Sequence, residues 1–174
     1  MDCKDLIVDG LSRIEEGMRT VLDGMAAEQL AFRPQPASNS IAWLAWHIAR
    51  VEDDHISELA GQPQAWVADG WHARFGRAAD PRDTGFGHGP EQVAGIAPDS
   101  SRVLLEYHQA VHQRSLAYIE TVSCTDLDRI VDRRFNPPVT AGVRLVSVID
   151  DCAQHMGQMA YVRGLIEGRR WLPW

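Results

Sequence analysis

The chain has 174 residues, of which 45% are hydrophobic and 24% charged; this is ordinary for a soluble globular protein and enough to bury one core. The net charge of −7 argues against a nucleic-acid-binding surface, because nucleic-acid-binding proteins usually carry a basic face. No apolar run of about 18 residues exists, so no membrane span is expected. We therefore predict a single domain over residues 1–174, with neither nucleic acid nor a membrane among its partners.

The N-terminal residues and the cysteines indicate a cytoplasmic protein. Acidic residues stand among the first positions and no apolar stretch follows, which argues against a secretory signal. The cysteines Cys3, Cys124 and Cys152 are odd in number and lack CxxC spacing. We therefore expect reduced thiols and a location in the cytoplasm.

Four amphipathic segments predict an all-α fold. Apolar residues recur at spacings of three, four and seven, as one buried helix face requires. The segments cover about residues 5–29, 40–59, 100–122 and 143–167. Gly168 is a suitable residue to end the last of these helices. The pattern predicts a four-helix bundle.

Two connecting segments are less regular. Residues 61–98 hold much of the glycine and proline, with Trp66, Trp71 and Phe75 that need somewhere to pack. This long loop lies between the second and third helices and is either a lid or a structural wrap. Residues 126–132 fit a short helical turn or an extended segment.

The stretch VIDDCAQHMGQMAYVRG, residues 148–164, places Asp151 four residues before His155 on the last helix. With 7 histidines and 24 acids in the chain, about one such pair is expected by chance, so the spacing alone says little. His47, in the apolar stripe of the second helix, supplies a third ligand. Two histidines and one carboxylate leave coordination positions open, which is typical of a catalytic metal site.

Blander and rival interpretations remain open. His47 could be a satisfied core histidine, and the pair on the last helix could be surface decoration. His108 and His112 also stand four apart, but their polar neighbours suggest partial exposure and no third ligand is evident. His72 and His88 lie in the long loop. We expect Cys152 to be a core residue rather than a ligand.

The motifs NSIAWLAWHIARVEDDH and PPVTAGVRLVSVIDDCAQHMGQMAYVRG resemble the DinB/YfiT-like superfamily over nearly the whole chain. More narrowly, they are similar to its mycothiol-dependent S-transferase branch, a relative of mycothiol-dependent maleylpyruvate isomerase. The resemblance implies a four-helix bundle with a divalent metal held by His47, Asp151 and His155. Asp150 is a less suitable carboxylate, because Gln154 is its partner at i+4. We expect zinc, with nickel, manganese or iron as alternatives.

The resemblance further implies a transferase that conjugates a low-molecular-weight thiol to small electrophiles, a role in detoxification and a homodimer. No catalytic residue is assigned. Trp43 beside His47, and Gln158 and Arg163 beyond His155, are candidate substrate-binding residues. Glu52 and Asp54 are candidates for hydrogen bonding to a ligating imidazole.

Two other classes of function stay open at this point. One is a metal-binding stress-response bundle without turnover. The other is a metal-dependent hydrolase or non-haem iron oxygenase, because two histidines and a carboxylate can serve either chemistry.

Overall fold

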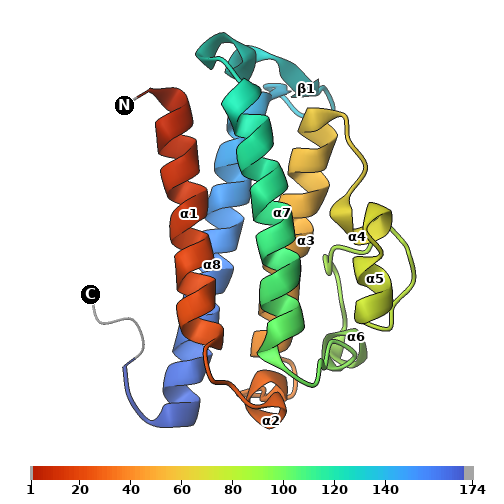
Figure 1. Ribbon diagram of the computed structural model, residues 1–174, viewed down its shortest axis with the longest axis vertical. Helices are drawn as coiled ribbons and strands as arrows, with labels where there is room; N and C mark the ends of the chain where they lie inside the picture. Colours follow the sequence, from red (N-terminus) through yellow and green to blue (C-terminus); the bar gives the residue numbers. More distant parts are fainter. Residues whose placement is uncertain (1, 171–174) are drawn as a thin grey trace.

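The structure is a computed structural model that describes residues 2–170, and most of these residues are helical (Figure 1). The long helices are α1 (Cys3–Leu22), α3 (Ile41–Ala60), α7 (Ser101–Thr121) and α8 (Ala141–Glu167). Both α1 and α3 pack against both α7 and α8, so the four helices enclose a common core. The predicted all-α four-helix bundle is confirmed. Among residues 2–170, no helix has the length and apolar character needed to cross a membrane.

Local interactions explain where the long helices begin and end. The carboxylate of Asp2 accepts hydrogen bonds from the first free amides of α1, and the Ser40 hydroxyl accepts one from the Trp43 amide at 3.1 Å. Gly61 and Gly168 adopt left-handed conformations, with φ of 64° and 66°, and end α3 and α8. The predicted role of Gly168 is therefore confirmed.

The predicted first helix over residues 5–29 is wrong at its C-terminal end. Helix α1 stops at Leu22, and α2 (Ala27–Ala31) is a separate short helix. Gly24 lies between them with φ of +67°, a conformation that an α-helix does not allow. Apolar residues on both sides of this turn keep the helical spacing, which is why the sequence pattern continues across it.

The loop predicted between the second and third long helices is packed against the bundle. It contains the short helices α4 (Ala65–Ala68), α5 (Trp71–Arg74) and α6 (Pro90–Ala94). Trp66 is wholly buried, and its ring lies 5.5 Å from that of Tyr107 on α7. The expectation that the aromatic residues of this loop need a packing site is confirmed.

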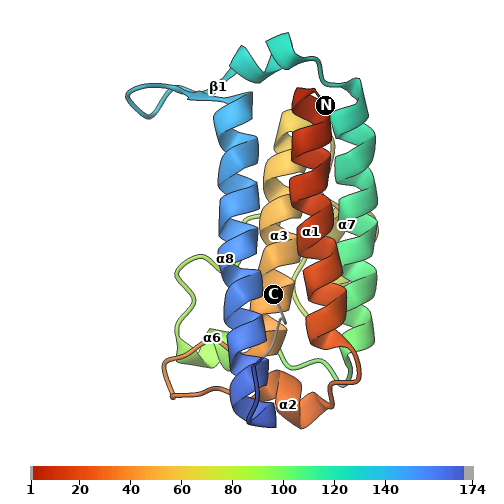
Figure 2. The same cartoon turned by 90° about the vertical axis from the view of Figure 1, so that its left-hand side faces the viewer.

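Both interpretations of the segment after α7 are realised in turn. A 3₁₀ helix, η1 (Cys124–Asp128), comes first, and the strands β1 (Ile130–Asp132) and β2 (Val139–Thr140) then pair antiparallel. Figure 2 shows this hairpin beside the start of α8, with α2 and α6 at the opposite end of the bundle.

The prediction of three reduced thiols is wrong for two of them. Cys3, at the start of α1, and Cys124, at the start of η1, form a disulfide across 121 residues of sequence. The two cysteines lie at the same end of the bundle, a proximity that spacing along the chain does not reveal. The disulfide therefore removes one of the reasons for expecting a reducing compartment.

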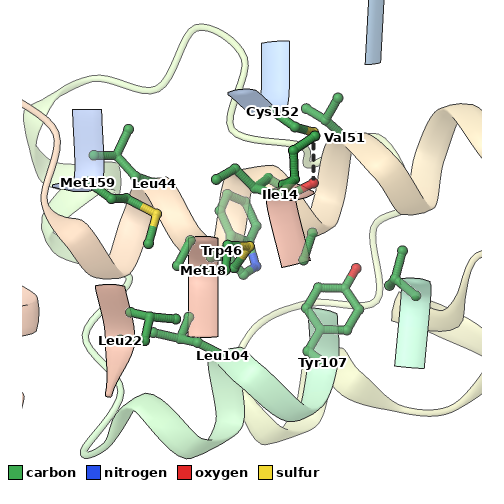
Figure 3. Packing of buried hydrophobic residues seen from close by; sticks show 14 of the residues in the cluster. Ile14, Met18, Leu22, Leu44, Trp46, Val51, Leu104, Tyr107, Cys152 and Met159 are labelled. Atoms are coloured by element: carbon green, nitrogen blue, oxygen red, sulfur yellow. Dashed lines mark hydrogen bonds between the residues drawn. The ribbon is translucent and has the colours of Figure 1, made fainter. Parts of the chain in front are cut away.

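Cys152 is a core residue, as predicted. It is fully buried among the apolar side chains of the bundle and its thiol donates to the Ile48 carbonyl at 3.7 Å (Figure 3). Burial raises the pKa of this thiol well above its ordinary value, so it is a poor nucleophile.

Candidate metal centre

His47 on α3 and the pair Asp151 and His155 on α8 meet in the seam between these two helices. One ligand atom from each lies within 4.8 Å of the others. The Nε2 atoms of His47 and His155 are each 3.7 Å from one oxygen of the Asp151 carboxylate. The structure thus brings together all three predicted ligands, and their role in binding a metal remains a prediction.

Hydrogen bonds fix which nitrogen of each imidazole is free. The Nδ1–H of His47 donates to the Thr84 carbonyl at 2.5 Å, because a carbonyl can only accept. The Nδ1–H of His155 donates to the Gln158 side-chain oxygen at 3.0 Å. Both Nε2 atoms therefore carry a lone pair, and both face Asp151.

The charge states suit a cation. Burial lowers the pKa of His47, against the raising effect of the Thr84 hydrogen bond, so the imidazole is neutral near pH 7. Neutral imidazole is the form that binds a metal. The Asp151 Oδ2 atom is buried and has no hydrogen-bond partner among residues 2–170. A buried carboxylate oxygen without a donor is costly, and a divalent ion held between it and two imidazole lone pairs would satisfy it.

An aromatic wall closes one side of the centre. The indole of Trp43, one helical turn before His47, stacks on its imidazole with ring centroids 4.7 Å apart and 13° between the planes. The same indole meets His155 edge-on at 6.2 Å. Trp43 is only 6% exposed, so it supports the imidazoles more than it offers a surface to a substrate.

The other two predicted substrate-binding residues are engaged in different ways. Gln158 holds the Nδ1–H of His155, so it positions that imidazole. Arg163 donates to the carbonyls of Val21 and Asp23 at 2.6 and 2.8 Å, which ties α8 to the end of α1. The structure therefore does not bring Arg163 into the cluster.

A glycine of the 61–98 segment lies directly on the centre. Gly85 has φ of +94°, and a Cβ added there would lie 2.9 Å from the rings of Trp43 and Trp46 and 3.0 Å from His47 Nδ1. Only glycine fits such a backbone. The sequence analysis missed this segment's contribution, although the glycines of TGFGHG, residues 84–89, are a signal that the backbone approaches other groups closely here.

The loop histidines lie outside the cluster of His47, Asp151 and His155. His88 uses both ring nitrogens: Nδ1 accepts from the Trp43 indole at 3.1 Å and Nε2 donates to Asp83 at 2.9 Å. His72 lies against Trp66, with its Nδ1 3.3 Å from the Arg77 carbonyl.

The expected partial exposure of His108 and His112 is wrong. They are 2% and 8% exposed and flank the fully buried carboxylate of Glu52, at 3.2 and 3.6 Å. Burial alone would raise the pKa of Glu52, but the two histidines outweigh it and lower the pKa to about 2. Glu52 is five residues after His47, roughly 140° around the helix at 100° per residue, so it faces α7 instead of the metal ligands. Asp54, the other acid considered, accepts from Gln64 at 2.6 Å.

A cavity of about 600 Å³ opens along the same seam. Its wall includes His55 on α3 and Arg144 on α8, whose side chains meet at 2.8 Å across the seam. His55 stands eight residues after His47, and Arg144 seven before Asp151, so the cavity lies about 10 Å along the helices from the ligands. Asp54, Glu58, Gln64 and Arg134 add donors and acceptors to its lining. Its chemistry suits a polar ligand.

Comparisons with known proteins identify the family and the fold. The model of the DinB superfamily matches residues 11–159. A solved structure described as a conserved protein from Enterococcus faecalis superposes with a TM-score of 0.90 and 31% sequence identity, covering 97% of this chain and 99% of that one. No curated protein matches.

Proposed function

This chain belongs to the DinB superfamily, and on that basis we propose that it is a divalent-metal-dependent transferase that joins a low-molecular-weight thiol to small electrophiles. The observation that carries the proposal is the His47–Asp151–His155 cluster, in which two imidazole lone pairs and an unpartnered carboxylate oxygen converge. Three protein ligands leave positions for an exogenous ligand, as catalytic zinc sites do.

The chemistry follows from that arrangement. A thiol coordinated to a divalent metal is deprotonated at neutral pH. The sulfur would form a bond to an electrophilic carbon while the thiol proton passes to solvent or to the product. A halide would leave with the electron pair of the broken bond, whereas an epoxide C–O bond would open and its oxygen, which stays in the product, would take up a proton. In an addition to an activated double bond, no group leaves and the neighbouring carbon takes up a proton.

The protein's own residues hold and shield the reacting groups. Thr84 and Gln158 keep the imidazole lone pairs turned inward, and Trp43 covers one side of them. We propose that the polar body of the thiol lies in the cavity along the α3–α8 seam, where Arg144, Asp54 and Gln64 provide hydrogen bonds. Polar groups at this distance from the metal would orient the sulfur without touching it.

The finer features remain part of the proposal. They are zinc as the metal, a thiol of the mycothiol kind, a role in detoxification, a homodimer and a cytoplasmic location. The location was predicted from the N-terminal residues and the cysteines, and it has lost the support of three reduced thiols; the other features accompany the family resemblance.

The test compares two adjacent aspartates. Asp151→Ala removes a proposed ligand, whereas Asp150→Ala removes an exposed carboxylate that bonds only Gln154 in the structure. We expect about one zinc per chain in the native protein and in Asp150→Ala, and loss of zinc in Asp151→Ala. With cobalt in place of zinc, binding of a thiol should produce a sulfur-to-cobalt charge-transfer band, and product should then form across a panel of electrophiles.

Each failure has its own meaning. Metal binding without a sulfur-to-cobalt band or product would favour the metal-binding protein without turnover. Equal zinc content in the two variants would remove the proposed centre altogether.

A further inference from the structure

The proposed centre depends on one imidazole that enters from α3, and the chain segment against that imidazole is not part of any long helix. The segment lies between α5 and α6 and runs along the lower half of the bundle (Figure 2). We infer that residues 81–88 form a clamp that fixes the orientation and the tautomer of His47, and that Arg50 and His88 are its positioning residues. The inference rests on the proposed metal site and adds residues to it.

Arg50 holds the backbone of the clamp. Its guanidinium is fully buried, and it donates to the carbonyls of Asp83 and Pro81 at 2.9 and 2.8 Å. These carbonyls lie one and three residues before Thr84, whose own carbonyl accepts from His47 Nδ1–H. A displacement of Arg50 therefore displaces the acceptor that determines which nitrogen of His47 carries the proton.

The guanidinium itself has little freedom. Its remaining hydrogens go to the side chains of Gln64 at 2.8 Å, Tyr107 at 3.1 Å and Asp53 at 3.3 Å. Asp53 is in turn held by the backbone amides of Ala65 and Trp66, at 2.8 Å each. Because a buried charge without these partners would be costly, the network holds the arginine in one position.

His88 holds the clamp by a second route, through the side chain of Asp83. The Trp43 indole can only donate, so Nδ1 of His88 is an acceptor and Nε2 carries the proton that goes to Asp83. Arg77 binds the other oxygen of Asp83 at 2.7 Å. This chain of hydrogen bonds fixes the indole that stacks on His47.

The two routes restrict His47 on three sides. The Thr84 carbonyl takes its Nδ1–H, the Trp43 indole covers one ring face, and the backbone of Gly85 leaves no room for a Cβ beside Nδ1. The ring cannot flip without breaking the clamp. A histidine whose second nitrogen is held by a carbonyl is also a better metal ligand, and loss of such a contact typically weakens metal affinity about 10- to 100-fold.

The experiment uses two changes in the clamp and one control in the same segment. Arg50→Lys keeps the charge and loses the forked contact with the two carbonyls. His88→Phe removes both hydrogen bonds and keeps a ring to stack on Trp46, where the centroids are 5.7 Å apart. Arg82→Gln is the control within the segment, because it leaves the backbone unchanged and replaces a side chain that is 89% exposed and, among residues 2–170, bonds only Asp80.

Two measurements are made on each protein. Long-range ¹H–¹⁵N spectra of the metal-free protein report the tautomer of His47, and competition with a chromophoric chelator gives the zinc Kd. We expect the Nε2–H tautomer of His47 to become populated in both clamp variants while His155 keeps its tautomer. Zinc affinity should fall about 10- to 100-fold in both and change less than about twofold in the control.

The opposite results are equally clear. Variants with unchanged circular dichroism, a His47 that stays Nδ1–H and an unchanged zinc Kd would overturn the clamp. Where Arg50→Lys does not fold, His88→Phe decides alone. If the native protein takes up no zinc, the proposed function fails, and the tautomer in the metal-free protein still decides whether the clamp exists.

Discussion

The seams on the two sides of α3 each contain two imidazoles and one carboxylate, in different arrangements. The α3–α8 seam holds His47, Asp151 and His155, and the α3–α7 seam holds Glu52, His108 and His112. In both seams the carboxylate turns one oxygen toward each imidazole, and in the α3–α7 seam His108 hydrogen-bonds to it at 3.2 Å. In the α3–α8 seam the N–H groups turn away to Thr84 and Gln158, and the lone pairs converge on the carboxylate.

The comparison indicates that the direction of the ring N–H groups decides whether such a cluster suits a metal ion, more than the residue types in it do. His108 Nε2 hydrogen-bonds to Glu52 at 3.2 Å, whereas His112 Nδ1 lies 3.6 Å from the other Glu52 oxygen and has no hydrogen-bond partner among residues 2–170. In the α3–α8 seam both ring N–H groups donate elsewhere, which leaves acceptors facing one another, and a bound cation would satisfy them. Within residues 2–170, the α3–α8 cluster is also the only group of three such residues whose ligand atoms all come within 4.8 Å.

The largest expected effect separates the two seams by metal binding. His155→Ala should weaken zinc binding by more than about 100-fold, since removal of a ligand exceeds the loss of a residue that only supports one. His112→Ala should change the zinc Kd less than about threefold once the folded fraction is taken into account. Isothermal titration with zinc measures the Kd of both variants. Equal losses of zinc affinity would show that the two seams do not differ in metal binding.

The next effect concerns stability against pH. The pKa of Glu52 falls from 4.5 to about 2 on folding. The stabilisation of the folded state by this ionised carboxylate is therefore complete above pH 4.5 and is lost as the pH falls from 4.5 toward 2. A shift of this size corresponds to about 3 kcal/mol of unfolding free energy. Glu52→Gln should therefore flatten this part of the pH profile in urea unfolding. A variant whose stability falls as steeply as that of the native protein would show that another acid is responsible.

A smaller effect is expected at Gly85. Gly85→Ala forces a Cβ against Trp43, Trp46 and His47 in a left-handed conformation, at a cost of about 1–3 kcal/mol. Zinc affinity should fall about tenfold through the displaced imidazole. Gly87→Ala is the matched control, because Gly87 also has a positive φ of +77° and nothing within 4 Å of its added Cβ. The same loss of zinc affinity in both variants would point to backbone strain alone.

The sequence was most informative where helical periodicity governs the structure. The spacing of apolar residues predicted the long helices. Because His47 lies in the apolar stripe of the second of these, the same spacing placed its side chain toward the inside of the bundle, where α8 packs. The i, i+4 relation then placed Asp151 and His155 on one face.

The sequence was less informative where tertiary contacts decide. Glu106, Gln109, Gln113 and Arg114 suggested an exposed face for α7, yet His108 and His112 turn inward, because Glu52 on another helix offers them a partner. The Thr84 carbonyl is invisible to any argument from residue types, since every residue has one. Likewise, the proximity of Cys3 and Cys124 follows from how the helices stack.

The disulfide also separates the four bundle helices into three that lie within a covalently closed loop and one that does not. The bond between Cys3 and Cys124 closes a covalent ring that contains α1, α3 and α7, and α8 lies outside it. Two of the three proposed ligands stand on that excluded helix, and the third stands inside the ring. A bound ion would cross-link α3, inside the ring, to α8, outside it. Removal of the metal should therefore lower the local stability of α8 before that of the other helices.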